Sequence, residues 1–236
     1  MRILAVDTSG PVAGAALMEN GVITHEVTAA HGLTHSQTAM PMIDQCLSAA
    51  GISVKDVDLF AAVAGPGSFT GVRIGVCAVR ALAHSWNKPA LQIDSLETLA
   101  MNCFGFHGII CPILDARRGQ VYCAAFRFEE GSLPERILPD EAMSLTDFLA
   151  KLPEDEKLIF LGDGLKVHFP AISAKLGSRA VAAPSHMNYL RAAAACEIAV
   201  HRADTAVDCK ELLPIYLRAP QAERERNARI AAGGTK

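Results

Sequence analysis

The sequence predicts an α/β fold built from two related halves. Apolar runs of strand length alternate with segments whose apolar residues recur every three or four positions, which indicates strands alternating with helices. The first half has the order β-β-β-α-β-α-β, and a reduced version of that order follows it. The chain has 236 residues, of which 50% are hydrophobic, enough to fill the cores of both halves.

The first half opens with three segments that can pair as antiparallel strands. Residues 2–7 form an aliphatic run, and Asn20-Gly21 separates two further strand-like runs at 12–19 and 22–29. Asn-Gly supplies the two positive-φ positions of a tight hairpin turn. The nearly continuous apolar run at 58–65 predicts a central strand that is covered on both faces.

Two helices complete the predicted first half. Apolar residues at helical spacing predict a helix over about 35–50, which Gly51 ends as a C-cap and in which Pro41 requires an early position or a kink. A second helix is predicted over about 68–86, and a short strand follows at 89–94. We expect residues 1–104 to form the first subdomain.

Residues 105–236 are expected to form the second, reduced subdomain. A predicted helix at 95–103 leads into it. Its predicted strands are 108–116, 119–128 and 157–162, and helices are predicted at 163–177 and 185–203. The Pro- and acid-rich stretch 129–157 predicts irregular surface structure. The tail after about residue 220 lacks an apolar period and is expected to be mobile.

Composition limits the classes of function. The net charge is −3, without a long basic block, so an independent nucleic-acid-binding protein is not expected. No apolar run is long enough to span a bilayer, and the first residues lack the features of a signal peptide. The seven cysteines are scattered without a C-x-x-C pair, which is typical of free thiols. We therefore expect a cytoplasmic protein.

The stretch "AGPGSFTGVRIGV" (64–76) is rich in glycine but matches neither common phosphate motif. A P-loop needs Lys where Val72 stands, and the dinucleotide fingerprint needs Gly where Thr70 stands. Two interpretations remain open. Ser68 can simply N-cap the next helix, or Gly67 and Ser68 can present free helix amides to an anion.

Gly71 and Gly75 lie within the second predicted helix, where each glycine costs about 1 kcal/mol relative to alanine. Small residues four positions apart let another backbone approach closely. The helix is also apolar around most of its surface, a pattern typical of a helix that is buried on all sides. Its own sheet can cover only one side, so a partner subunit is a candidate for the other.

Duplicated halves of this order resemble the actin/Hsp70/sugar-kinase (ASKHA) architecture. In such a fold Asp7, Thr8 and Ser9 would meet the phosphates and metal of a nucleotide, whereas the simpler interpretation is a turn. Gly162-Asp163-Gly164 is likewise either a turn or the remnant of an adenosine-binding loop. His31 and His35 have the spacing of metal ligands, but Gly32 lies between them and no third ligand is evident, so no metal site is predicted there.

Four motifs together resemble the TsaB (YeaZ) family: "ILAVDTS", "HSQTAMPMI", "AGPGSFTGVRIGV" and "LPIYLRAP". That family comprises accessory subunits for the synthesis of N6-threonylcarbamoyladenosine (t6A) in tRNA. The resemblance implies a degenerate ASKHA fold and no catalysis by this subunit alone. It also implies pairing with the transferase TsaD, which has the same fold, and association with the ATPase TsaE.

The resemblance also implies that a metal site has been lost. The transferase family holds its metal with a His-x-x-x-His pair after the strand that follows the second helix. In this chain Ser95 and Leu99 stand at those positions, so no metal and no catalytic residue are expected. A required cofactor is not expected either, although ATP or ADP can bind at the interface of the complex.

In the family, the two helices of the first half pack against a partner, which is TsaD or a second copy of the chain. We therefore expect a homodimer when the chain is alone, and contact with tRNA through the complex. The expected interface residues are Met42, Ile43, Cys46, Phe69, Gly71, Val72, Gly75, Val76 and Val79. Two alternatives stay open: a nucleotide-binding sensor that uses Asp7, and a glycoprotease-like hydrolase.

Overall fold

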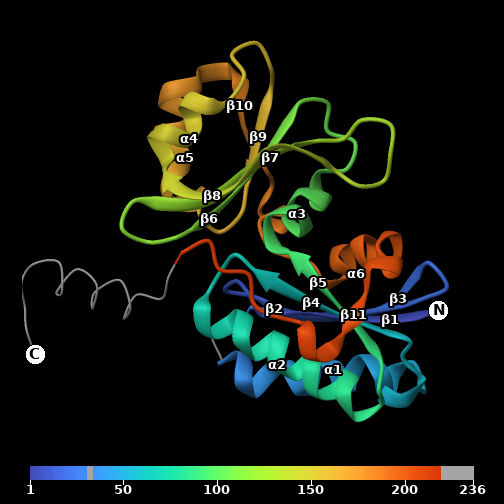
Figure 1. Ribbon diagram of the computed structural model, residues 1–236. Coiled ribbons are helices and arrows are strands. Elements are labelled where there is room, and N and C mark those ends of the chain that lie inside the picture. The colour runs from blue at the N-terminus through green and yellow to red at the C-terminus, as the bar shows by residue number, and fades with distance from the viewer. Residues whose placement is uncertain (31–33, 219–236) are drawn as a thin grey trace, which may run out of the picture.

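The structure is a computed structural model that describes residues 1–30 and 34–218, and it consists of two lobes with one sheet each (Figure 1). The strands of the first sheet are β1 (Arg2–Asp7), β2 (Ala13–Glu19), β3 (Val22–Ala29), β4 (Leu59–Gly65), β5 (Pro89–Asp94) and β11 (Val207–Asp208). Their order is β11-β5-β4-β1-β2-β3. The hairpin at Asn20-Gly21 is confirmed, with φ of 51° and 81° at the two residues.

The second sheet repeats this arrangement. Its strands are β6 (Ile109–Asp115), β7 (Gln120–Arg127), β8 (Glu135–Ser144), β9 (Leu158–Leu161) and β10 (Ala180–Ala182), in the order β10-β9-β6-β7-β8. In both sheets the first three strands pair antiparallel, and the next two continue parallel from the first. The predicted two-lobed α/β fold with a duplicated strand order is therefore confirmed.

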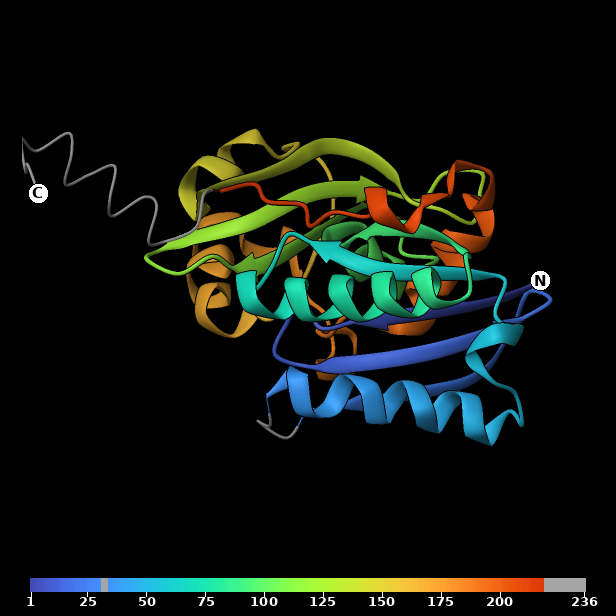
Figure 2. The same ribbon diagram turned by 60° about the horizontal axis from the view of Figure 1, so that its bottom comes forward.

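Helices cover both faces of the first sheet. The α-helices are α1 (His35–Ala49), α2 (Phe69–Ser85), α3 (Ser95–Ala100), α4 (Leu145–Lys151), α5 (Leu165–Leu176) and α6 (Ala192–His201). Figure 2 shows α1 and α2 side by side on one face of the first sheet, while α6 lies on the other (Figure 1). The side chains of β1 alternate accordingly: Leu4 and Val6 pack toward α1 and α2, and Ile3 and Ala5 pack toward α6.

Six short 3-10 helices connect these elements: η1 (Val54–Asp56), η2 (Met101–Cys103), η3 (Gly177–Arg179), η4 (Ser185–Met187), η5 (Ala203–Thr205) and η6 (Cys209–Glu211). One continuous core joins the two sheets through α3 and α6. A separate core on the far side of the second sheet lies under α4 and α5. No helix in the described part of the chain has the length and apolarity needed to cross a membrane.

The structure corrects three expectations for the second half. Residues 129–157 were expected to be irregular, but they contain the edge strand β8 and helix α4. The helix expected at 185–203 is the shorter α6, which η4 precedes. Residue 104 does not separate the lobes, because α6 packs on β1 and β2 and because β11 pairs with β5. The tail after residue 220 lies outside the described residues.

Candidate functional site

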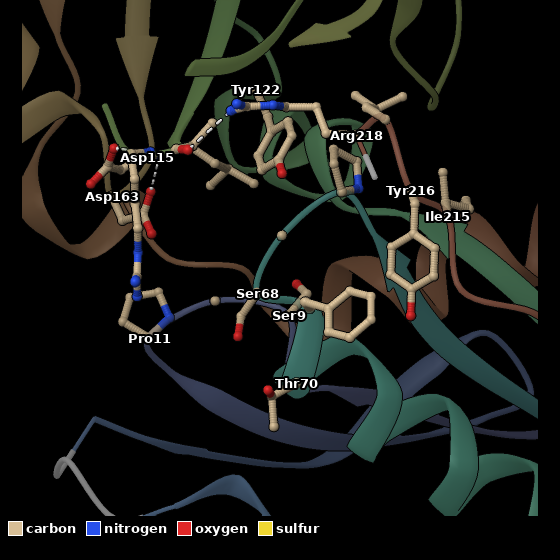
Figure 3. Close-up of a pocket in the computed structure, with 18 of the residues that line it drawn as sticks. Ser9, Pro11, Ser68, Thr70, Asp115, Tyr122, Asp163, Ile215, Tyr216 and Arg218 are labelled. Atoms are coloured by element: carbon tan, nitrogen blue, oxygen red, sulfur yellow. Dashed lines mark hydrogen bonds between the residues drawn. The ribbon is translucent and has the colours of Figure 1, made fainter. Parts of the chain in front are cut away.

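A cleft of about 640 Å³ opens between the two lobes. The first lobe lines it with residues 9–11 and 66–70, the second lobe with 114–117 and Asp163, and the C-terminal segment with 215–218. Figure 3 shows Ser9 and Ser68 on one side, Asp115 and Asp163 on the other, and Tyr216 and Arg218 at the rim. The structure therefore brings together several segments that the sequence singled out.

The glycine-rich loop packs against the chain's own first loop. Ser68 N-caps α2 by accepting a hydrogen bond from the Gly71 amide at 3.2 Å, as predicted. The Ser68 amide donates to the Ser9 carbonyl at 2.7 Å. A Cβ at Gly67 would collide with that same carbonyl. The glycine therefore admits the Ser9 backbone, and two amides at the start of α2 are already occupied within the chain.

Asp7, Thr8 and Ser9 are buried beneath the cleft. One Asp7 carboxylate oxygen, Oδ1, accepts hydrogen bonds from the Ser9 amide at 2.8 Å and the Ser9 hydroxyl at 2.7 Å. The other oxygen, Oδ2, has no partner within the described residues. Burial raises the pKa of Asp7 to about 6, against the opposing effects of the Ser9 hydrogen bonds and the nearby His35. This carboxylate is the most perturbed acid at the cleft.

The second lobe contributes two linked carboxylates. Asp163 accepts a hydrogen bond from the Asp115 amide at 2.9 Å, and Asp115 accepts one from the Arg117 amide at 2.7 Å. Burial raises the pKa of Asp163. The bond to Asp163 fixes the end of β6 against the loop that begins at Gly162. Both carboxylates are therefore engaged in shaping their own loops.

Ser95 and Leu99, the positions at which the resemblance implies a lost metal pair, are both buried. Ser95 is buried at the start of α3 and donates a hydrogen bond to the Ser9 hydroxyl at 3.2 Å. Leu99, one helical turn later, is fully buried in the core that joins the two sheets. The described residues contain no group of three His, Cys, Asp or Glu side chains arranged to hold a metal. His31 lies outside the described residues, and His35 contacts the Gly10 carbonyl at 2.8 Å.

Most of the residues predicted for an interface lie in the chain's own core. Eight of the nine are buried within this chain, under α1 and α2 and against the first sheet: Met42, Ile43, Cys46, Gly71, Val72, Gly75, Val76 and Val79. Phe69 alone among the nine is partly exposed. The most apolar stripe of an amphipathic helix packs on its own sheet, so it cannot also form a docking surface.

A different set of residues faces outward. We define the outer face as the following exposed residues, spaced one turn apart along each helix: Met40, Asp44 and Ser48 on α1, and Thr70, Arg73, Cys77 and Ala81 on α2. Met40 is 47% exposed, and Cys77 is the only exposed cysteine of the seven. Apart from Met40, these positions are recognisable in the sequence because a polar or small residue interrupts the apolar period there.

Known proteins resemble this chain over most of its length. Residues 23–230 match the family model of TsaD, tRNA N6-adenosine threonylcarbamoyltransferase. The tRNA threonylcarbamoyladenosine biosynthesis protein TsaB of Bacillus subtilis is 37% identical over 225 residues, which is 94% of this chain and 96% of that protein. The protein of the same name from Haemophilus influenzae is 28% identical and covers 92% of this chain and 94% of its own length.

The solved structures agree with the sequence relatives. The structure of YeaZ from Pseudomonas aeruginosa superposes with a TM-score of 0.77 at 24% identity, covering 92% of this chain and 99% of that one. The likeness of fold thus extends over both lobes. The chain is 37% identical to its Bacillus subtilis relative over nearly all of its length, and the TsaD family model matches most of its residues. The chain therefore belongs to the TsaB family, a branch of the wider family that the TsaD model describes.

Proposed function

We propose that this chain is a non-catalytic subunit for t6A synthesis in tRNA, which pairs with the transferase TsaD and activates it. One observation carries the proposal: the chain matches the transferase family over residues 23–230, yet Ser95 and Leu99 replace the expected ligand pair and are buried. A leucine cannot ligate a metal, and the Ser95 hydroxyl is hydrogen-bonded within the chain. These two positions support a chain that keeps the family fold without that catalytic centre.

The outer face supports a pairing role. Its α2 residues are small apart from Arg73, so the backbone of another helix can approach closely over Cys77 and Ala81. We propose that TsaD docks here in the cytoplasm, that a second copy does so when TsaD is absent, and that TsaE joins the pair. Contact with tRNA is then made chiefly by the assembled complex.

Reconstitution tests this function. TsaD and TsaE from the same source are incubated with tRNA, ATP, bicarbonate and threonine, with and without this chain, and t6A is measured by mass spectrometry of the digested tRNA. We expect t6A only when the chain is present, and none from the chain alone. Equal t6A formation with and without the chain would overturn the proposal.

Nucleotide binding in the cleft is a second candidate, which the unpartnered, buried Asp7 Oδ2 beneath Ser9 favours. Against it, the amides of Ser68 and Gly71 already bond within the chain. Calorimetric titration of the chain and of its complex with TsaD, using ATP and ADP with magnesium, distinguishes the two functions. A stoichiometric heat that disappears in Asp7→Asn would support a nucleotide site, and no heat in either sample would exclude it.

A further inference from the structure

Arg73 is held in one place on the outer face of α2 by two aromatic rings. Its guanidinium lies 3.8 Å from the centroid of the Phe69 ring and 5.8 Å from that of Tyr216. The two rings stack on each other with centroids 5.0 Å apart. The Arg73 Nε also donates a hydrogen bond to the Tyr216 hydroxyl at 2.7 Å. An exposed arginine that is normally free to rotate is therefore fixed in orientation.

Tyr216 itself is fixed by the C-terminal segment. The neighbouring Ile215 amide donates to the Ala64 carbonyl at 2.7 Å, at the end of β4. Two residues after Tyr216, Arg218 donates to the Ala116 carbonyl of the second lobe at 3.2 Å. Figure 3 shows Ile215, Tyr216 and Arg218 in succession along the rim of the cleft. The segment thus joins both lobes and places Tyr216 beside α2.

Arg73 has hydrogen-bond donors that no residue within 1–30 and 34–218 occupies. A guanidinium carries five N–H groups, and only the Nε of Arg73 bonds to a described residue. Other arginines in the described part of the chain pair with carboxylates, among them Arg2, Arg127, Arg136, Arg191 and Arg202. No carboxylate of the described residues forms an ion pair with Arg73. The N–H groups on its two terminal nitrogens have the planar arrangement that binds both oxygens of a carboxylate.

The surroundings of Arg73 favour a protein partner over a nucleic acid. The exposed residues one turn to either side on α2 are the uncharged Thr70 and Cys77. Binding of a phosphate backbone normally uses several cations together. A single oriented arginine among small residues is instead typical of an anchor at the centre of a protein interface.

We propose that Arg73 is the anchor that receives an Asp or Glu carboxylate of TsaD when TsaD docks on the outer face, and that Tyr216 is a positioning residue for it. This inference rests on the proposed pairing function. Because Nε is already satisfied by Tyr216, the two terminal nitrogens remain for the incoming carboxylate. Because the rings already restrict the side chain, less conformational entropy is lost when the ion pair forms.

Calorimetric titration of the full chain with TsaD from the same source tests this inference. We expect Arg73→Ala to weaken binding by roughly 10- to 100-fold, as for a buried interfacial charge that loses its partner. Arg73→Glu should weaken binding further through repulsion, and Arg73→Lys should restore it only in part. Tyr216→Phe keeps the stacked ring but removes the hydroxyl, and should weaken binding by roughly 3- to 10-fold.

Arg80 provides a matched control on the same helix. Its guanidinium donates to the Lys210 carbonyl of the chain itself at 3.1 Å, so Arg80→Gln should leave the affinity for TsaD unchanged. A positioning role for Tyr216 also predicts non-additivity. In the Arg73→Ala background, Tyr216→Phe should have no further effect on affinity, because the residue that it orients is gone. Thermal unfolding of each variant verifies that it is folded.

The outcomes separate the inference from the function on which it rests. Absence of binding by the unaltered chain would overturn both. Tight binding by the unaltered chain and by Arg73→Ala alike would overturn only the anchor. The anchor is also overturned if Arg73→Ala abolishes binding of tRNA, or self-association of the chain, while the affinity for TsaD stays unchanged. Loss of tRNA binding would mean that Arg73 binds a phosphate of tRNA, and loss of self-association would mean that it contacts a second copy of the chain.

Discussion

The hydroxyl of Thr8 donates a hydrogen bond to the Gly71 carbonyl at 2.7 Å and lies 2.5 Å from the point where a Cβ on Gly75 would stand. The first loop of the chain therefore occupies the space that the two helical glycines leave open. The glycines serve close packing within the chain, and their conformational cost is offset by this contact. On the proposed pairing, the partner surface therefore lies on the opposite side of α2.

Gly75→Ala is expected to lower the free energy of unfolding by about 1–3 kcal/mol, because the new methyl group displaces the Thr8 hydroxyl from its hydrogen bond. Urea unfolding measures the change. Gly131→Ala is the matched control, since nothing lies within 4 Å of the added Cβ. Equal stability of the Gly75→Ala variant and the unaltered chain would contradict the packing described here.

Because the pKa of Asp7 is raised in the folded chain, we expect the free energy of unfolding to depend on pH. The Asp7 pKa of about 6 in the folded chain exceeds the ordinary value of 3.8, so the folded state binds the proton more tightly than the unfolded state. The stabilisation from this proton is full below about pH 4 and is lost as the pH rises to about 6, with a total on the order of 2–3 kcal/mol.

Asp7→Asn should remove that pH dependence. Urea unfolding of the variant and of the unaltered chain is compared at intervals between pH 4 and pH 7, and the difference between the two isolates Asp7 from other titrating groups. We expect the stability of the unaltered chain to fall relative to the variant across this range. A constant difference at every pH would show that Asp7 titrates normally.

Cys77 reports directly on the outer face. All seven cysteines of the chain are described, and six of them are buried, so a maleimide should label the native protein at one thiol. Saturating TsaD should slow this labelling by at least about 10-fold, because a docked helix excludes the reagent from the centre of an interface. Labelling after denaturation, which exposes all seven thiols, is the control. An unchanged labelling rate in a proven complex would place the contact elsewhere.

Glu97 on α3 and Arg202 at the end of α6 form an ion pair at 2.9 Å, in which Glu97 is 3% exposed and the Arg202 side chain 41% exposed. Arg202→Met should cost about 2–4 kcal/mol of stability, because it leaves a buried carboxylate unpaired. Adding Glu97→Leu to that variant should recover most of the loss. A double-mutant cycle in urea measures the coupling, and additive effects of the two changes would refute it.

Local signals predicted the first lobe well. The Asn20-Gly21 turn and the Ser68 N-cap depend on residues next to one another in sequence, so their structures follow from local chemistry. The continuous apolar run of β4 likewise identifies a strand covered on both faces. Strand β8 was missed because it lies at a sheet edge with its side chains exposed or half-buried, and its composition resembles that of a loop.

The candidate site depends on contacts between distant parts of the chain, which composition and spacing do not contain. Thr8 meets Gly71 across 63 residues of sequence, and Arg73 meets Tyr216 across 143. The sequence indicated that α2 is apolar around most of its surface, but which of its sides packs on the sheet depends on where the sheet lies. That is why the interface residues predicted from sequence proved to be core residues.

Sedimentation velocity of this chain, of TsaD from the same source and of their mixture tests the central claim most directly. A partner subunit predicts a single faster-sedimenting species in the mixture that contains both proteins in fixed ratio. The sum of the two separate sedimentation profiles, at concentrations well above micromolar, would contradict it.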